Sequence, residues 1–178
     1  KLSSRSGIIN DLDLLLKLNA SEALFNKKEY VKALAMANEC EKLATKAGAN
    51  RRLIQTLELK GMITFKQKDY KKARVFLQKV IDTRNNNESN LSNAYLYLGR
   101  IAKEEKKYTE GFEFLQQSKS GSEAAEDDNS LWEVLYETGN IYLLSGKKDS
   151  AIYNYKKAVE IVSKLSTKLV GSEEEKNK

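Results

Sequence analysis

The chain has 178 residues, 40% of them hydrophobic and 31% charged, with one cysteine, no histidine and a formal net charge of +6. The missing histidine excludes His-based acid–base catalysis and His metal ligation, and a single cysteine excludes an internal disulfide. We therefore expect no catalytic activity, no metal and no cofactor, while carboxylate, lysine or tyrosine chemistry stays open.

The absence of proline and the small number of glycines favour a helical chain. In chain order, we predict helices over residues 8–26, 30–47, 51–67, 70–84, 90–106, 108–119, 130–145 and 148–168. Asp69 and Asp149 are expected to cap the helices that follow them, and Ser130 with Glu133 forms a capping-box pattern. Residues 120–129 are predicted to be an acidic loop, and residues 171–178 a flexible tail.

Targeting signals are not evident in the sequence. Residues 1–10 lack the apolar run of a signal peptide. No stretch approaches the ~18 consecutive apolar residues that a membrane span needs. Together with the single cysteine, these features favour a cytoplasmic protein.

Small residues recur along the chain at a regular spacing. Four of them are separated by 40, 38 and 40 residues: Ala33, Ala73, Gly111 and Ala151. Twelve residues before each of these stands another small residue: Ser21, Gly61, Gly99 and Gly139. Four residues after each stands an apolar one: Ala37, Leu77, Leu115 and Tyr155. This pattern is typical of two helices per repeat that cross closely at the small residues.

The repeated pattern resembles the tetratricopeptide repeat family over roughly residues 8–168. The segments that carry the resemblance best are Tyr97-Leu-Gly99, Gly139-Asn-Ile-Tyr142 and Ala151-Ile-Tyr-Asn-Tyr155-Lys-Lys-Ala158. The resemblance implies an all-α helix-turn-helix repeat solenoid, a right-handed superhelix of about four repeats and eight helices. The repeats would occupy about 8–50, 51–88, 89–129 and 130–168 of a single array over residues 1–170.

The period near 40 residues is longer than the usual 34 residues of the family. It is similar to the subfamily found in kinesin light chains and bacterial peptide-sensing regulators. Some family members hold a chaperone's C-terminal carboxylate in a clamp, whose places are taken here by Leu18, Glu22, Leu59, Asn93 and Tyr97. Recognition of such a carboxylate is therefore not expected.

The resemblance also implies that the first helix of each repeat lines a concave groove that binds a protein or peptide. The expected groove residues are Glu58, Met62, Phe65, Leu96, Tyr97, Arg100, Lys103, Tyr136, Glu137, Asn140 and Leu143. Their aromatic and aliphatic members would anchor the partner, and Arg100 and Lys103 would pair with an acidic segment of it. Packing between repeats is the alternative role for each of these side chains.

We therefore expect a non-catalytic peptide-binding scaffold or sensor module, as part of a larger signalling protein. The alternative is a nucleic-acid or acidic-polymer binder, because residues 1–84 carry a net charge of +9 and residues 85–178 one of −3. Lysine pairs recur at the turn inside each repeat: Lys27/Lys28, Lys66/Lys68, Lys106/Lys107 and Lys147/Lys148. These lysines would either form a basic edge or complement the helix C-termini.

Three other features have a simple structural interpretation. Cys40 is predicted to be a buried small hydrophobe, and the acidic residues around Glu123 and Glu126 to be solvated. The last predicted helix carries a wide apolar face, formed by Ile152, Tyr155, Val159, Val162, Leu165, Leu169 and Val170 among others. Because the end of a repeat array exposes what a further repeat would cover, we expect a further helix or a second copy of the chain on this face.

Overall fold

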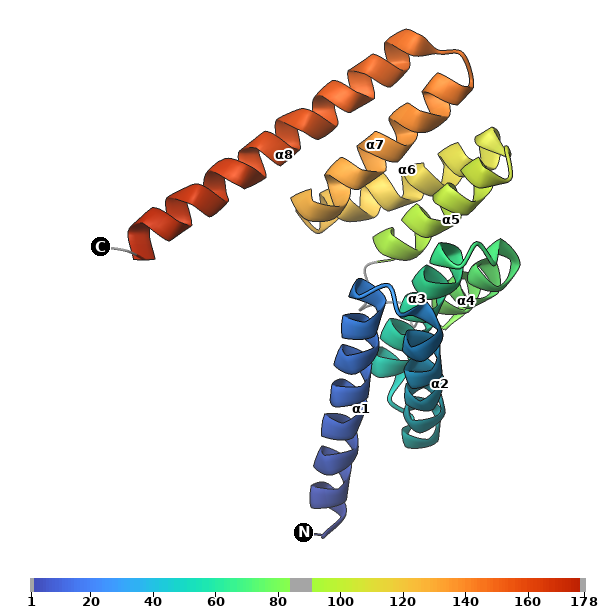
Figure 1. Ribbon diagram of the computed structural model, residues 1–178, viewed down its shortest axis with the longest axis vertical. Coiled ribbons are helices and arrows are strands. Elements are labelled where there is room, and N and C mark those ends of the chain that lie inside the picture. The colour runs from blue at the N-terminus through green and yellow to red at the C-terminus, as the bar shows by residue number, and fades with distance from the viewer. Residues whose placement is uncertain (1, 84–90, 177–178) are drawn as a thin grey trace. The chain divides into compact units, whose positions relative to one another are not determined.

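The computed structural model describes the backbone of residues 2–83 and 91–176, and the side chains of residues 11–83 and 91–168. The described residues form helices and no strands, in two compact units over residues 1–88 and 89–178 (Figure 1). Unit 1 contains α1 (Leu2–Asn26), α2 (Tyr30–Ala47), α3 (Asn50–Lys66) and α4 (Tyr70–Asp82). Unit 2 contains α5 (Ser92–Glu104), α6 (Tyr108–Ala124), α7 (Asp128–Leu144) and α8 (Lys148–Lys176). The predicted all-α helical repeat fold is confirmed, and a single array over residues 1–170 stays a prediction.

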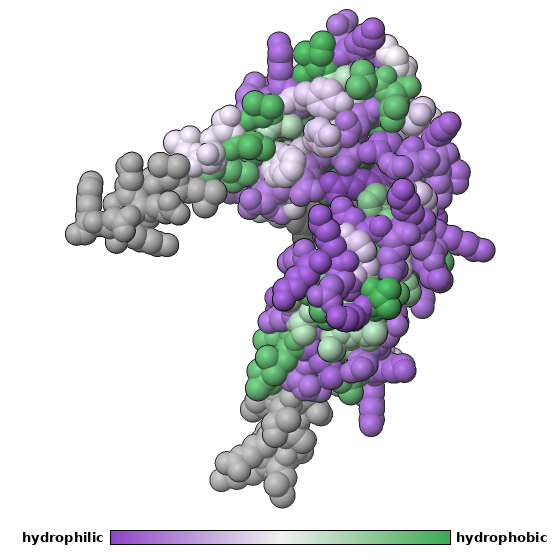
Figure 2. All heavy atoms as spheres, in the orientation of Figure 1, coloured by the Kyte–Doolittle hydropathy of each residue, from purple (hydrophilic) through white to green (hydrophobic). Residues whose placement is uncertain are grey.

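Each unit is built from two antiparallel helix pairs with a core between them. The core of unit 1 includes Leu14 and Leu18 of α1, four small residues of α2, and Leu59 and Ile63 of α3. The core of unit 2 includes Leu96 of α5, Leu115 of α6, and Val134 and Ile141 of α7. The surface in Figure 2 is mostly hydrophilic, with hydrophobic side chains over α7 and α8 among the exceptions.

The small residues predicted at the helix crossings are where the paired helices approach each other. A Cβ atom added to Gly99 would lie 2.8 Å from the Leu115 side chain, and one added to Gly139 would lie 2.5 Å from Tyr155. In the first pair Ser21 takes the same place, and its Oγ donates to the Ala33 carbonyl at 2.8 Å. The predicted repeat register is therefore confirmed at these crossings.

The turn inside each repeat has the same backbone conformation. Lys28, Lys68 and Lys106 have φ between 60° and 62°, and Gly146 has φ 77° at the corresponding place of the last repeat. In the first of these turns the Lys28 and Glu29 N–H groups donate to the Phe25 and Leu24 carbonyls, and the other three turns repeat this pattern. These are Schellman motifs, in which a left-handed residue ends the first helix and reverses the chain.

Two helices extend beyond their predicted ends. α6 continues to Ala124, so residues 120–124 are helical and not part of the predicted acidic loop. The helical period explains this difference, because the buried positions Gly111, Leu115, Ser118 and Ser122 continue one stripe through the polar segment. α8 continues to Lys176, so most of the predicted tail from residue 171 is helical.

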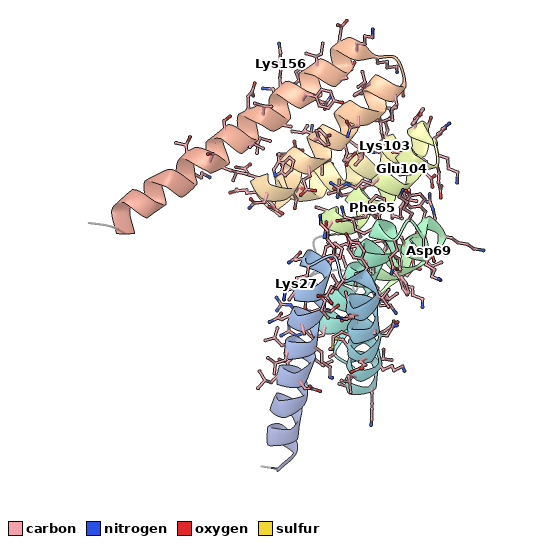
Figure 3. The ribbon with its side chains drawn as sticks, in the orientation of Figure 1. Lys27, Phe65, Asp69, Lys103, Glu104 and Lys156 are labelled. Atoms are coloured by element: carbon pink, nitrogen blue, oxygen red, sulfur yellow. The ribbon has the colours of Figure 1, made fainter. Side chains whose placement is uncertain are left out.

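The start of α1 and two predicted caps also differ. α1 begins at Leu2 and not at residue 8. The cap of α7 is Asp127, whose carboxylate accepts from the Asn129 and Ser130 N–H groups, so the capping box at Ser130 is wrong. Asp149 lies inside the first turn of α8 and is not its cap. Asp69, labelled in Figure 3, is confirmed as the cap of α4. Its carboxylate accepts a hydrogen bond from the Lys72 N–H at 3.1 Å.

Among the described residues, none of the helices combines the length and the apolar character that crossing a bilayer requires.

Candidate functional site

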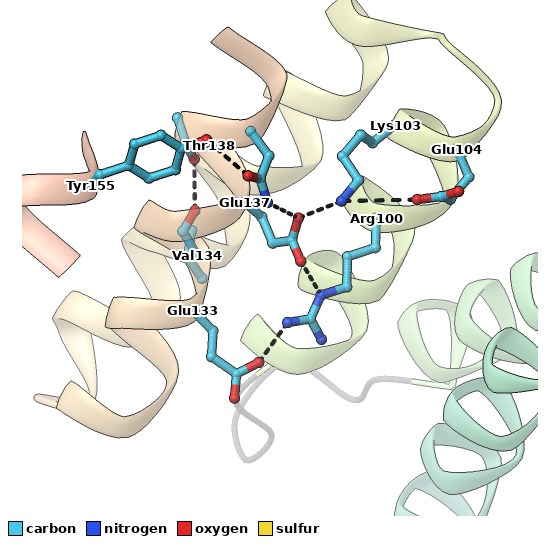
Figure 4. Close-up of polar contacts among 9 residues, drawn as sticks. Arg100, Lys103, Glu104, Glu133, Val134, Glu137, Thr138 and Tyr155 are labelled. Atoms are coloured by element: carbon cyan, nitrogen blue, oxygen red, sulfur yellow. Dashed lines mark hydrogen bonds and ion pairs between the residues drawn. The ribbon is translucent and has the colours of Figure 1, made fainter. Parts of the chain in front are cut away.

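A network of charged side chains joins α5 to α7 in unit 2 (Figure 4). Arg100 donates from Nε to Glu137 Oε1 at 2.9 Å and from Nη2 to Glu133 Oε2 at 2.6 Å. Lys103 Nζ donates to Glu137 Oε2 at 2.7 Å, and Asn140 Nδ2 donates to the same oxygen at 3.1 Å. Both oxygens of the Glu137 carboxylate therefore accept hydrogen bonds from unit 2 itself.

The network is largely buried and electrically balanced. The exposed fractions of the Arg100, Lys103 and Glu137 side chains are 14%, 17% and 9%. Burial opposes the charge on Arg100, but the nearby Glu137 and Glu133 carboxylates outweigh this effect and raise the pKa of Arg100. Burial likewise opposes the charge on Glu137, but its bonds to Lys103, Arg100 and Asn140 lower the pKa of Glu137. The two cations already have internal anions, so a partner's acidic group would have to displace Glu133 or Glu137.

Two predicted groove anchors are buried side chains. Leu96 is 2% exposed and belongs to the core of unit 2, so its expected role as a ligand anchor is wrong. Leu96 packs with Leu115 and Val134 because the inward face of α5 meets both α6 and α7. Tyr97 is 6% exposed, and the Arg100 guanidinium lies over its ring at 4.9 Å from the centroid. Tyr97 therefore supports the network and offers little surface to a partner.

Three other predicted groove residues lie on α7: Tyr136, Asn140 and Leu143. Tyr136 and Leu143 are 47% and 50% exposed. Asn140 accepts a hydrogen bond from the Tyr155 hydroxyl of α8 at 2.9 Å, and the Tyr136 and Tyr155 rings are 5.8 Å apart. On α8, Ile152 and Val159 are 50% and 64% exposed. We call these six residues the end face; hydrophobic side chains over α7 and α8 are visible in Figure 2.

The preceding repeat shows what the end face lacks. Forty residues earlier, Leu96 and Leu115 occupy the places of Tyr136 and Tyr155, and both are buried beneath Val134 and Ile141 of α7. Phe112, at the place of Ile152, packs against the Tyr142 ring at a centroid distance of 4.5 Å. The end face is thus the same kind of surface that α7 covers one repeat earlier, without a covering helix among the described residues.

A shallow hollow marks the α8 side of the end face. Its volume is about 480 Å³, and it is lined by Ile152, Tyr155, Lys156, Val159 and Glu160. The predicted apolar face of the last helix is therefore exposed at Ile152, Val159 and, with 44% exposure, Val162. Leu169 and Val170, predicted for the same face, lie outside the residues whose side chains are described.

The predicted groove residues of unit 1 are Glu58, Met62 and Phe65, all half-buried on α3. The Phe65 ring packs 5.6 Å from the Tyr70 ring at the turn between α3 and α4. A groove that combines these residues with those of unit 2 stays a prediction.

Other candidate residues have the simple environments that the sequence favours. Cys40 is fully buried, and its sulfur accepts a hydrogen bond from Thr56 Oγ1 at 3.2 Å. The eight lysines of the turns are all exposed. Among the residues whose side chains are described, no group of acidic, His or Cys residues is arranged to hold a metal ion.

Glu133, which was expected to belong to a capping box, instead accepts a hydrogen bond from Arg100 and was not among the predicted site residues. A signal for its pairing is nevertheless present, because Glu133 and Glu137 are four residues apart on one helix and Arg100 and Lys103 three residues apart on another. Such spacings place each pair on one face of its helix. Two oppositely charged pairs on the first helices of adjacent repeats indicate a contact between those helices.

Family models describe much of the chain. A model described as Tetratricopeptide repeat matches residues 90–164, and another with the same description matches residues 54–87. No curated protein sequence matches the chain.

Several solved structures have a similar fold at low sequence identity. BtubC (BKLC) from P. vanneervenii is 12% identical, with a TM-score of 0.75 over 88% of this chain and 66% of that one. The MamA RS-1 ArsTM double mutant is 20% identical, with a TM-score of 0.62 over 86% of this chain and 77% of that one. YrrB, described as a TPR protein with an unusual peptide-binding site, is 15% identical, with a TM-score of 0.52 over 90% and 92%. The chain thus spans just under two thirds of the BtubC chain.

Proposed function

We propose that the chain, which belongs to the tetratricopeptide repeat family, is a protein-interaction scaffold that binds an amphipathic helix of a partner protein on the end face. The observation that carries this proposal is the exposure of Tyr136, Leu143, Ile152 and Val159 on adjacent faces of α7 and α8. Clustered exposed apolar side chains are typical of interaction sites. The family is generally non-catalytic, and the proposal extends this property to the chain.

The preceding repeat supplies the template for the bound segment. There α7 packs its Val134 and Ile141 side chains against the faces of α5 and α6. A partner helix with apolar residues at the same spacing of seven positions would meet the end face in the same way. An amphipathic helix therefore fits the surface better than an extended chain does.

The end face also specifies how the bound helix differs from α7. Where α5 has Arg100 and Lys103, α7 has Asn140 and Leu143, so the cations that hold Glu137 have no counterpart on the end face. A buried carboxylate without a cation is costly. The partner helix should therefore carry an apolar residue at the place that Glu137 has on α7.

An acidic partner segment is a weaker proposal. It requires Arg100 and Lys103 to be available, and both donate to Glu137 within 2.9 Å. A role as the sensor part of a larger signalling protein is likewise a weaker proposal, which only the family membership of the chain supports.

The experiment measures binding of labelled peptides to the full chain by fluorescence anisotropy. One peptide has the α7 sequence, residues 128–144, and the other carries the Glu137→Leu substitution in that sequence. We expect the substituted peptide to bind more tightly. We also expect Ile152→Glu with Val159→Glu in the protein to weaken its binding about tenfold or more, because charges would replace contact residues.

The matched control is Val31→Glu on α2, because Val31 is 77% exposed and lies in unit 1. This variant should bind the substituted peptide as the natural chain does. Failure of both peptides to bind, or equal binding by the end-face variant, would contradict the proposal. Light scattering on the same variants tests a second copy as the occupant, since self-association through the end face should be lost in the double glutamate variant alone.

A nucleic-acid or acidic-polymer binder is the second candidate, favoured by the exposure of all the turn lysines. Such binding should weaken steeply as salt rises, with a log-linear dependence. Lys27→Glu with Lys28→Glu should reduce it, whereas the end-face variant should leave it unchanged.

A further inference from the structure

A second hollow lies on another side of unit 2, between α6 and α8. Its volume is about 830 Å³, and Thr138 and Tyr142 of α7 line it together with side chains of α6 and α8. We call it the outer groove. Neither Tyr155 nor any other end-face residue lines the outer groove, so the groove is a separate surface.

The corresponding place in unit 1 is filled by a lysine. The repeats of the two units correspond at an offset of 78 residues, which places Lys60 of α3 at Thr138. The Lys60 side chain is 5% exposed, and its ammonium forms an ion pair with Glu41 of α2. The same ammonium lies 4.2 Å from the centroid of the Phe76 ring of α4. One buried cation thus contacts all the helices that surround this place.

Unit 2 lacks all three of these side chains. The offset places Thr138 at Lys60, Lys119 at Glu41 and Asn154 at Phe76. Thr138 donates its hydroxyl to the Val134 carbonyl, so it stays close to its own helix. Lys119 pairs with Glu123 of its own helix at 3.5 Å. Thr138 and Asn154 are shorter than Lys60 and Phe76, so the outer groove is open where unit 1 holds its cation; Lys119 also lines this groove.

The lining of the outer groove provides other groups that attract a cation. Phe112, Tyr142 and Tyr153 contribute aromatic rings. Glu113 and Asp149 contribute carboxylates, and among the described residues neither forms an ion pair. Aromatic faces and carboxylates together bind ammonium and guanidinium groups.

We propose that the outer groove binds a lysine or arginine side chain of a partner protein, at the place that Lys60 fills within unit 1. The aromatic rings contact the aliphatic stem and the cation, and Glu113 and Asp149 supply the counter-charge. This site is independent of the end face, so either one can fail without the other.

The test is an NMR titration of the full chain with N-acetyl-lysine amide. N-acetyl-norleucine amide, which has a similar stem without the charge, is the matched probe, and N-acetyl-arginine amide distinguishes the two cations. We expect shifts at Thr138, Tyr142 and Asn154, and a preference of about fivefold or more for the cationic probes over norleucine. Equal affinity for lysine and norleucine, or shifts located elsewhere, would overturn the proposal.

Two variants test the assignment to this groove. Glu113→Gln with Asp149→Asn changes exposed side chains only, and it should remove the preference for the cation. Lys119→Glu, Thr138→Lys and Asn154→Phe together copy unit 1 and should block the groove. Full retention of selective binding by the Glu113→Gln, Asp149→Asn variant contradicts the proposal even if the triple variant does not fold.

Discussion

Unit 1 and unit 2 have the same helix arrangement but bury charge in different places. Between the first helices, unit 1 has Phe25 and Leu59 where unit 2 has Lys103 and Glu137. Around the second helices it is unit 1 that buries charge: the Lys60–Glu41 pair lies where unit 2 has the outer groove. The helix crossing geometry therefore does not decide whether a buried place is apolar or ionic.

The comparison also shows why the two units are expected to bind differently. In a repeat protein each helix pair packs only against the neighbouring pairs. A charged contact can therefore replace an apolar one when the residues on both sides of that contact change together. In unit 2, Arg100 and Lys103 of α5 pair with carboxylates of α7. The side chains exposed on the end face are mostly apolar.

The largest expected effect comes from breaking the unit 2 network. Glu137→Ala should destabilise unit 2 by about 3–5 kcal/mol, because Lys103 would keep only the exposed Glu104, 3.9 Å away, and Arg100 only Glu133 as counter-charges. Lys103→Phe with Glu137→Leu, which copies unit 1, should recover most of this loss. Trp132, the chain's single tryptophan, lies on α7, so urea unfolding followed by its fluorescence reports on unit 2. An equal loss in the single and double variants would show that the units are not interchangeable here.

A smaller effect is expected at the helix crossings. Gly99→Leu should cost about 1–3 kcal/mol, because even its Cβ would lie 2.8 Å from the Leu115 side chain. In unit 1 the same crossing pairs Ser21 with Ala37. Gly99→Ser should therefore also destabilise unit 2, by less than Gly99→Leu does. Thermal melting checks both, and an unchanged midpoint for Gly99→Leu would contradict the repeat register.

Acid should weaken unit 2 through Glu137. Its pKa is lowered in the folded chain, so its stabilising contribution is present above about pH 4.3, the ordinary glutamate pKa, and is lost as the pH falls through the lowered value. Leu59 at the same place in unit 1 has no such dependence. Acid titration of Trp132 fluorescence should show a steeper loss of stability for the natural chain than for Glu137→Gln. Parallel titration curves for the natural chain and Glu137→Gln would contradict the assignment of the acid sensitivity to Glu137.

The smallest expected effect concerns the left-handed turn residues. Lys68→Gly should stabilise unit 1 by up to about 1 kcal/mol, because glycine adopts φ 62° without the strain of a side chain. Gly146→Ala should cost unit 2 a similar amount, since its added Cβ would contact nothing within 4 Å and only the backbone conformation is strained. Thermal melting of the two variants should show shifts of opposite sign.

The repeat pattern predicted the fold well because its small residues lie where the paired helices pack closely. A Cβ atom added to Gly61, Gly99 or Gly139 would lie 2.7, 2.8 or 2.5 Å from a side chain of the paired helix, so the spacing of these glycines indicates the pairing and register. The end of α6 was missed because Ser122 is polar and yet buried. The groove was predicted less well, since Leu96 and Tyr136 have the same place in adjacent repeats and only the helix packed against Leu96 makes it core.

Hydrogen–deuterium exchange of the full chain, with and without the Glu137→Leu peptide of residues 128–144, can show which helices form the binding surface. Protection from exchange reports which helices a bound segment stabilises. We expect new protection confined to α7 around Tyr136–Leu143 and to α8 around Ile152–Val162. Protection around Arg100 and Lys103, or around Glu58–Phe65 in unit 1, without protection of α8 would contradict it and place the partner in the groove first predicted from the sequence.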